Sequence, residues 1–153
     1  MRKNMVILAV VAVLLALPAV ALAQTGQGTG TVHAEGDGTA YLRGEGWVRI
    51  SGNGTLVIRD RAGDAEIQVS GHGSHAGRGQ GLVYRGWNGE AYVRGSAITV
   101  AVRGTDIRLE AAGTGVVYLR GQGWYTFGGE QRAWTAQGVQ LDLAPQTPAS
   151  AAP

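Results

Sequence analysis

The chain has 153 residues, no cysteine, and 13 Lys and Arg against 11 Asp and Glu. Without cysteine it can form no disulfide and carry no lipid on a cysteine at its N-terminus. Two of the basic residues, Arg2 and Lys3, belong to the leader described next. The rest of the chain is therefore neutral and lacks the basic excess typical of nucleic-acid-binding domains, so no nucleic-acid partner is expected.

The N-terminal segment, up to Ala23, has the three parts of a secretory signal peptide. Arg2 and Lys3 give a positive start, residues 5–23 are uncharged and apolar, and Ala21-Leu22-Ala23 has the small-residue spacing of a cleavage site. We expect cleavage after Ala23 and a secreted or extracytoplasmic protein. The alternative is an uncleaved anchor, because a run of this length nearly spans a bilayer. No second apolar run follows, so no membrane contact is expected beyond this segment.

All 26 glycines lie after residue 23, so the chain that follows the expected signal peptide is rich in glycine. Between glycines, which recur about every eight or nine residues, apolar and polar residues alternate with the period of half-buried strands. This pattern predicts a single glycine-rich β-repeat domain over residues 31–143, with no helix. Residues 24–30 are expected to be a flexible lead-in, and residues 144–153, rich in Pro and Ala, a disordered tail.

One phrase occurs three times, as Tyr41-Leu42-Arg43-Gly44, Tyr92-Val93-Arg94-Gly95 and Tyr118-Leu119-Arg120-Gly121. A diverged copy ends at Gly71, so four closing glycines follow one another at nearly equal steps. The spacing predicts four repeats of about 25 residues.

We expect about twelve short antiparallel strands that form a shallow closed barrel. Asn53-Gly54 and Asn88-Gly89 are typical of two-residue hairpins, and closure would remove free sheet edges. The alternative is a short β-solenoid, whose corners do not reverse the chain.

The Tyr-x-Arg-Gly phrase, the short strands, the glycine turns and the export signal together resemble the β-flower type of protein. That resemblance implies a shallow, near-symmetric barrel with radiating hairpins. It is one of pattern, and it implies no functional residues.

Two groups of residues are candidates for ligand contact. In each repeated phrase Tyr and Arg lie two apart and share a strand face, so a ring of them could bind sugars or acidic polymers. The plainer interpretation is that they are cross-strand pairs that stiffen the sheet. The tryptophans of two copies either form an exposed aromatic patch or cover glycines of the turns. The candidates are Tyr41, Arg43, Tyr92, Arg94, Tyr118, Arg120, Trp47 and Trp124.

No catalytic, cofactor-binding or metal-ligating residues are assigned. No serine lies in Gly-x-Ser-x-Gly, and His72 and His75 have no third ligand at a fixed spacing. The sequence thus favours a non-enzymatic secreted or cell-surface domain with a structural, adhesive or self-associating role, whose partners are envelope glycans or its own copies. The alternative is a barrel that binds a small ligand or a glycan with its apolar interior or a Tyr/Arg rim.

Overall fold

The computed structural model describes residues 24–79 and 81–144, and this part of the chain is all β, without a helix. The predicted all-β class is therefore confirmed. The predicted signal peptide, its cleavage site and the predicted disordered tail beyond residue 144 lie outside the described residues.

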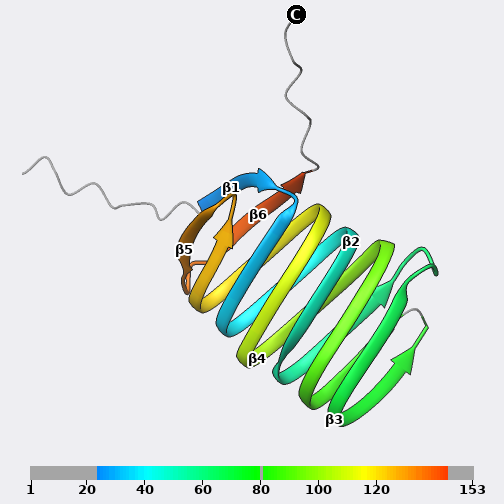
Figure 1. Cartoon of the computed structure of the whole chain (residues 1–153). Helices are drawn as coiled ribbons and strands as arrows, with labels where there is room; N and C mark the ends of the chain where they lie inside the picture. The colour runs from blue at the N-terminus through cyan, green and yellow to red at the C-terminus, as the bar shows by residue number, and fades with distance from the viewer. Residues whose placement is uncertain (1–23, 80, 145–153) are drawn as a thin grey trace, which may run out of the picture.

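Six strands make up one sheet (Figure 1). They are β1 (Gln24–Thr29), β2 (Thr31–Asp60), β3 (Glu66–Arg78), β4 (Gly81–Phe127), β5 (Glu130–Trp134) and β6 (Val139–Ala144). Two of them, β2 with 30 residues and β4 with 47, form most of the sheet and run antiparallel. The segment expected to be a flexible lead-in forms β1, which lies parallel to β6.

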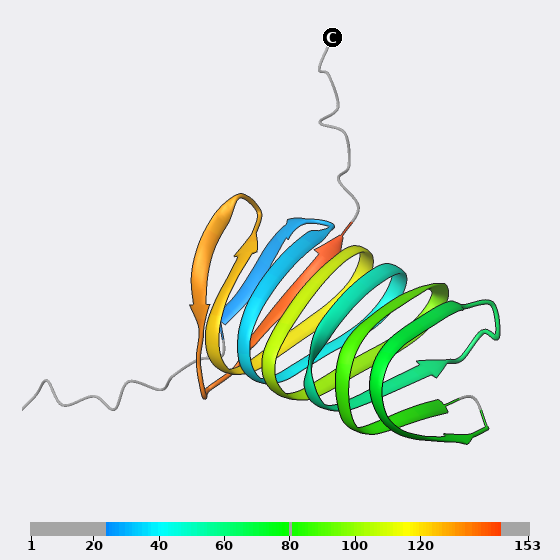
Figure 2. The same ribbon diagram turned by 60° about the horizontal axis from the view of Figure 1, so that its bottom comes forward.

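The two long strands wind around each other as a coil, which Figures 1 and 2 show from two sides. Most residues of β2 pair with β4 on both sides. Ala34, for example, pairs with Leu109 on one side and with Tyr125 on the other. The stretch of β4 from Leu109 to Tyr125 is therefore one turn of the coil, and β2 lies between neighbouring turns of β4.

The coil bends where glycines meet across the sheet. Such facing glycines are Gly36 and Gly123, Gly38 and Gly121, Gly44 and Gly115, Gly46 and Gly113, Gly54 and Gly104, and Gly71 and Gly89. Gly46 shows why the bends require glycine. Its φ is +134°, and a Cβ there would lie 2.1 Å from the carbonyl oxygen of Ala112. Glycine kinks of this kind are how a sheet acquires strong curvature.

The predicted hairpins at Asn53-Gly54 and Asn88-Gly89 are wrong, because both pairs lie inside continuous strands and Asn53 pairs with Asn88. The glycines there let the chain bend without reversing. The chain reverses instead between β3 and β4, where Arg78 pairs with Gly81, and between β4 and β5, where Phe127 pairs with Glu130.

The predicted closed barrel is also wrong, because the sheet is not closed: β1, β3 and β5 each pair with one strand only. Strands that continue around the bends replace the twelve short strands that were expected. The winding shares with the alternative, a short β-solenoid, corners that do not reverse the chain, but its neighbouring turns are antiparallel.

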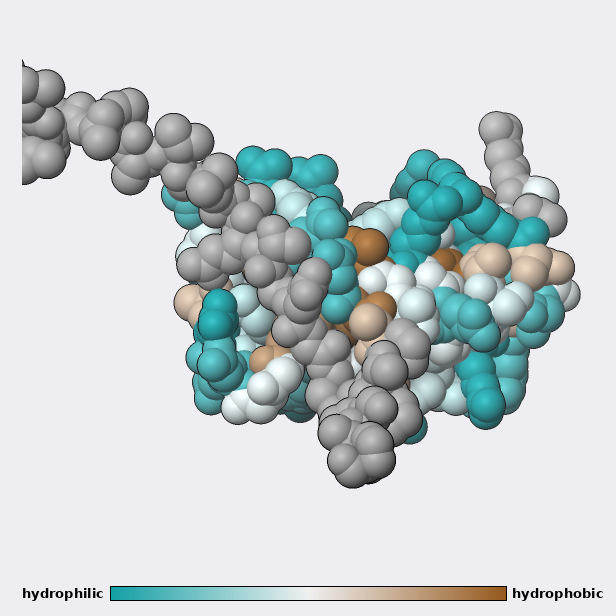
Figure 3. Space-filling view, turned by 90° about the horizontal axis from the view of Figure 1, so that it is seen from above, coloured by the Kyte–Doolittle hydropathy of each residue, from teal (hydrophilic) through white to brown (hydrophobic). Residues whose placement is uncertain are grey.

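Flattening of the coil gives it two sides with a core between them. Alternate residues of every straight segment point inward, and those of β2 and β4 are almost fully buried, including Val48, Ile50, Val100 and Leu109. Figure 3 looks onto the coil from above and shows hydrophobic residues (brown) at the visible surface only in small patches among hydrophilic ones. The alternation read from the sequence therefore identifies the core correctly.

Two tryptophans cover the ends of the core. Trp134 of β5 is 1% exposed, packs over Gly36 and Gly123, and donates its indole N–H to the carbonyl oxygen of Glu35 at 3.0 Å. Trp87, also 1% exposed, donates to the carbonyl oxygen of Ser70 at 3.1 Å near β3. Each indole satisfies its own donor, and that of Trp134 also fills space that glycines leave.

Candidate functional site

One side of the coil, which we call the arginine face, is formed by the outward side chains of residues 39–43, 55–59, 74–76, 81–85, 99–103, 116–120 and 140–142. Register joins these segments edge to edge, since facing residues of neighbouring strands point the same way. Its arginines are Arg43, Arg59, Arg85, Arg103 and Arg120. Asp142 is the one acidic residue among these segments, so the face is strongly basic.

The arginines stand in two rows on either side of a less polar one. In the first row Thr99 pairs with both Arg43 and Arg59. In the second, Thr39 pairs with both Arg103 and Arg120. The row between them follows the register from Ala76 of β3 to Tyr118 of β4, through Val83, Val57, Ala101 and Tyr41.

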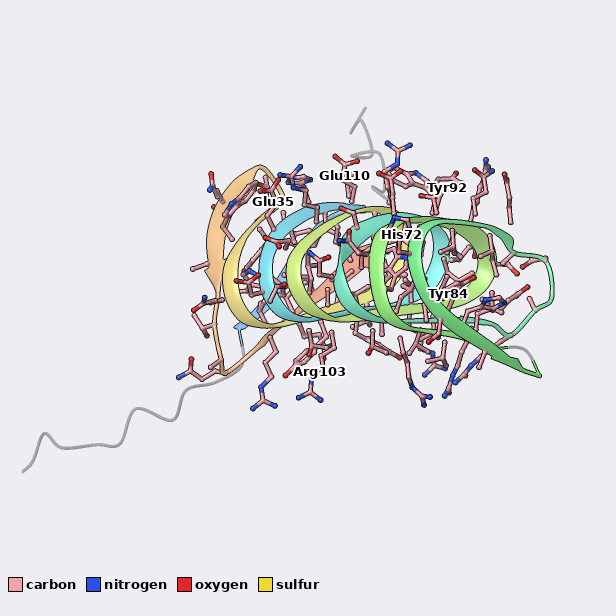
Figure 4. All side chains as sticks on the ribbon, turned by 90° about the horizontal axis from the view of Figure 1, so that it is seen from below. Glu35, His72, Tyr84, Tyr92, Arg103 and Glu110 are labelled. Carbon is pink, nitrogen blue, oxygen red and sulfur yellow. The ribbon has the colours of Figure 1, made fainter. Side chains whose placement is uncertain are left out.

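The opposite side, which we call the mixed-charge face, is formed by the outward side chains of residues 31–35, 47–51, 66–70, 90–94, 107–112 and 124–126. Figure 4 shows Glu35, Tyr92 and Glu110 along one margin of the coil and Arg103 along the other. Glutamates here lie beside basic groups, with Arg49 at 3.7 Å from Glu90 and Arg108 at 3.9 Å from Glu35.

The two faces differ more in whether their basic side chains lie beside carboxylates than in their residue composition. On the mixed-charge face His33 also lies 3.4 Å from Glu110, so carboxylates there have basic side chains as neighbours. Within the described residues, no arginine of the arginine face has a carboxylate within 4.0 Å. Arg120 donates to the carbonyl oxygen of Ala136 at 3.0 Å, which leaves its charge uncompensated.

The structure divides the predicted Tyr–Arg phrases between the two faces. Tyr41 and Tyr118 pair directly on the arginine face, with Arg43 and Arg120 exposed beside them. The third copy, Tyr92 and Arg94, lies on the mixed-charge face. The three phrases therefore do not form one ring.

The predicted tryptophans both lie half-buried on the mixed-charge face. Trp47 stacks on Tyr92 with ring centroids 6.4 Å apart, and Trp124 lies 5.3 Å from the ring of His33. These are two separate aromatic pairs. Covering of glycines, which was one interpretation of the tryptophans, is the role of Trp134.

A hollow of about 500 Å³ lies at the β3 end of the arginine face. Its lining includes Val57, Arg59, Ser74, Ala76, Val83 and Arg85. A volume of this size is in the range of small-molecule sites.

Sequence reasoning did not single out Arg59, Arg85 and Arg103, although each lies on the polar phase of its strand. The alternation of apolar and polar residues could have predicted that these three side chains point outward. It could not have predicted that they lie on the same face, because that depends on which segments of β2 and β4 pair.

The two histidines considered for metal binding have different neighbours. His75 stacks on Tyr84 with ring centroids 5.4 Å apart, while His72 pairs with Asn88 at a bend. No group of three or more His, Asp or Glu suited to a metal ion is found among residues 24–79 and 81–144.

No family model, curated protein or solved structure matches the chain. The part of the chain that the structure describes contains no helix that is long and apolar enough to cross a membrane.

Proposed function

We propose that this protein is a non-enzymatic, secreted or cell-surface adhesive domain that holds an acidic polysaccharide of the cell envelope on its arginine face. One observation carries the proposal: five arginines share one side of the sheet without a carboxylate partner among residues 24–79 and 81–144, whereas Arg49 and Arg108 of the other side have one. Uncompensated charge on one face calls for an anionic partner of matching extent.

Arginine suits such a partner chemically. Its planar guanidinium donates two parallel hydrogen bonds to a carboxylate, and these bonds are strong because both groups are charged. Tyr41 and Tyr118 add flat aromatic surfaces with a polar end, which favour contact with sugar rings. The face thus combines charge recognition with ring contact.

The rows fit a linear polymer. Arg43 and Arg59 are two strands apart, which is roughly 10 Å along the coil, and Arg103 and Arg120 have the same relation. An extended polysaccharide whose acidic groups alternate between its two sides would present them to both rows. Its rings would then lie over the row that runs from Val57 to Tyr118.

The dense packing of the interior favours ligand binding on the arginine face over binding in an internal cavity. Most of the inward side chains, from Val32 to Leu143, are less than 5% exposed, and partly buried ones such as Ile67 and Leu82 pack against the same cluster. The alternative of a small ligand bound in the apolar interior therefore gains no support, and the predicted Tyr/Arg rim corresponds in part to the arginine face.

Of the four predicted repeats, only two supply their Tyr–Arg phrase to the proposed binding face. The phrases at Tyr41 and Tyr118 supply the centre of the arginine face, because their strands are neighbours. We propose that the repeats record duplication of a strand-and-corner unit, of which one copy came to lie on the other face.

Binding of polygalacturonate and of neutral dextran to the exported protein, measured by isothermal titration calorimetry, tests the proposal. We expect polygalacturonate to bind, dextran not to bind, and the affinity to fall with salt. The double variant Arg43→Gln/Arg103→Gln should weaken binding at least about tenfold, since each charged hydrogen bond contributes roughly 1.5–3 kcal/mol.

A matched control removes two arginines from the mixed-charge face. Arg49→Gln/Arg108→Gln changes the net charge equally but should leave the affinity for polygalacturonate within about threefold of that of the unchanged protein. The proposal is wrong if both double variants weaken binding equally, if no binding occurs, or if single-stranded DNA binds as tightly through the same arginines.

A further inference from the structure

The hollow at the β3 end is lined mainly by apolar surface and is open to solvent at its rim. Val57 pairs with Val83, and Val83 pairs with Ala76, so three short side chains form a row across three neighbouring strands. Short residues between long arginines create the depth of the hollow, whose volume is about 500 Å³.

An arginine stands at each end of this floor. Arg59 lies opposite Gly81, and Arg85 is four positions further along β4, which places their backbones roughly 13 Å apart. Both are exposed and line the hollow, and Ser74, which pairs with Arg85, adds a hydroxyl. Apolar floor and charged ends are the features of a site for a compact anion with an apolar ring face.

We propose that this hollow is the specific subsite of the arginine face, where two linked uronic-acid units bind with ring faces on the floor and one carboxylate at each arginine. This inference rests on the proposed function and adds to it which part of the polymer is recognised. The remaining arginines then contribute further, weaker contacts along the chain of the same polymer.

The size and charge of the hollow favour this ligand over others of the same sign. Inorganic phosphate would leave the floor uncovered and would reach one arginine at a time. Two sugar rings cover the row of Val57, Val83 and Ala76, and their two carboxylates satisfy both guanidinium groups.

The test uses digalacturonate as the short probe and polygalacturonate as the long one, with the exported protein and two tryptophan variants. Ala76→Trp fills the hollow. Ala112→Trp is the matched control, because Ala112 points outward on the mixed-charge face, where it pairs with Thr31 and Trp47, away from the hollow. Both positions are at least partly exposed, so thermal unfolding should show little change.

We expect the unchanged protein to bind digalacturonate and Ala76→Trp to weaken that binding at least tenfold, while Ala112→Trp leaves it within twofold. Arg59→Gln and Arg85→Gln should each weaken it by a similar factor, which keeps the test independent of the tryptophan.

The result that overturns the inference is polygalacturonate binding with digalacturonate either unbound or bound equally by Ala76→Trp. That outcome leaves the proposed function standing. If neither probe binds the unchanged protein, both proposals fail, so the two failures are distinguishable.

Discussion

Backbone conformation at single residues makes the winding of this sheet feasible. At Gly46 the chain bends with φ of +134°, and a β-carbon would lie 2.1 Å from the carbonyl oxygen of Ala112. Both conditions exclude a side chain, because L-residues rarely adopt that conformation and the neighbouring backbone cannot yield. The regular glycine spacing in the sequence therefore marks bends of the coil.

Gly46→Ala should lower the free energy of unfolding by about 2 kcal/mol or more, the order expected for one strained backbone position. Gly77→Ala is the control, since a β-carbon there meets only a Leu82 methyl group at 3.6 Å and the Gly81 carbonyl oxygen at 4.0 Å. Its effect should stay within about 0.5 kcal/mol. Urea unfolding at constant slope measures both, and equal effects of the two changes would contradict the role of Gly46.

The connection from β2 to β3 is fastened by a carboxylate. Ser96 donates its backbone N–H to Asp64 at 3.1 Å. Hydrogen bonds from the Ser96 hydroxyl and then from this N–H hold the pKa of the Asp64 carboxyl below its usual value of 3.8. A lowered pKa in the folded state stabilises the fold above the unfolded value, and this contribution is lost as the pH falls through the folded value.

Asp64→Asn should therefore reduce stability at pH 7, and the difference from the unchanged protein should shrink and vanish below pH 3.8. Carboxyl titration by NMR gives the pKa directly, and Ser96→Ala should raise it towards its usual value. A pKa of Asp64 that Ser96→Ala leaves unchanged would rule out this fastening.

At the scale of elements, the sequence predicts which residues are inside but not which strands are neighbours. Alternation places Val48, Ile50, Ile107 and Leu109 in the core, and all four are buried. The same alternation says nothing about the pairing of β2 with β4 on both sides, because that pairing joins residues as distant in the sequence as those at the start of β2 and the end of β4.

Local signals also explain the wrong hairpins. Asn-Gly indicates a backbone that tolerates positive φ, which a hairpin reversal needs and which Gly54 adopts in a bend, with φ of +150°. Asn53-Gly54 faces Asn88 and Trp87 in the neighbouring strand, so the chain bends there and continues. For the candidate site, the sequence could predict that Tyr41 and Arg43 point outward on one face of their strand. That Arg59 and Arg103 lie beside them follows only from the pairing register of β2 and β4.

The pairing of Tyr41 with Tyr118 can be tested because the chain has no cysteine. Facing residues of antiparallel strands have β-carbons roughly 4.5–5.5 Å apart. We expect Tyr41→Cys/Tyr118→Cys to be joined rapidly by a short thiol-specific crosslinker, as detected by mass spectrometry of digested monomer. Tyr41→Cys/Tyr92→Cys, with its thiols on opposite faces, should not be joined, and efficient joining of the second pair would contradict the two-sided coil.

At the scale of the whole molecule, the winding of the strands places many basic and acidic residues on opposite sides of the coil. Basic and acidic residues are interspersed along the chain and leave it nearly neutral, yet the coil gathers five arginines on one side and Glu35, Glu66, Glu90 and Glu110 on the other. Net charge alone therefore hides a strongly basic surface, and that surface is the basis of the proposed function.

The most direct test of this account is an NMR titration of the isotopically labelled protein with oligogalacturonate. We expect shift changes at the amides of residues 39–43, 57–59, 81–85 and 99–103, on the arginine face, and unchanged signals around Trp47 and Trp124. Shift changes centred on those two tryptophans, or none at saturating oligogalacturonate, would contradict it.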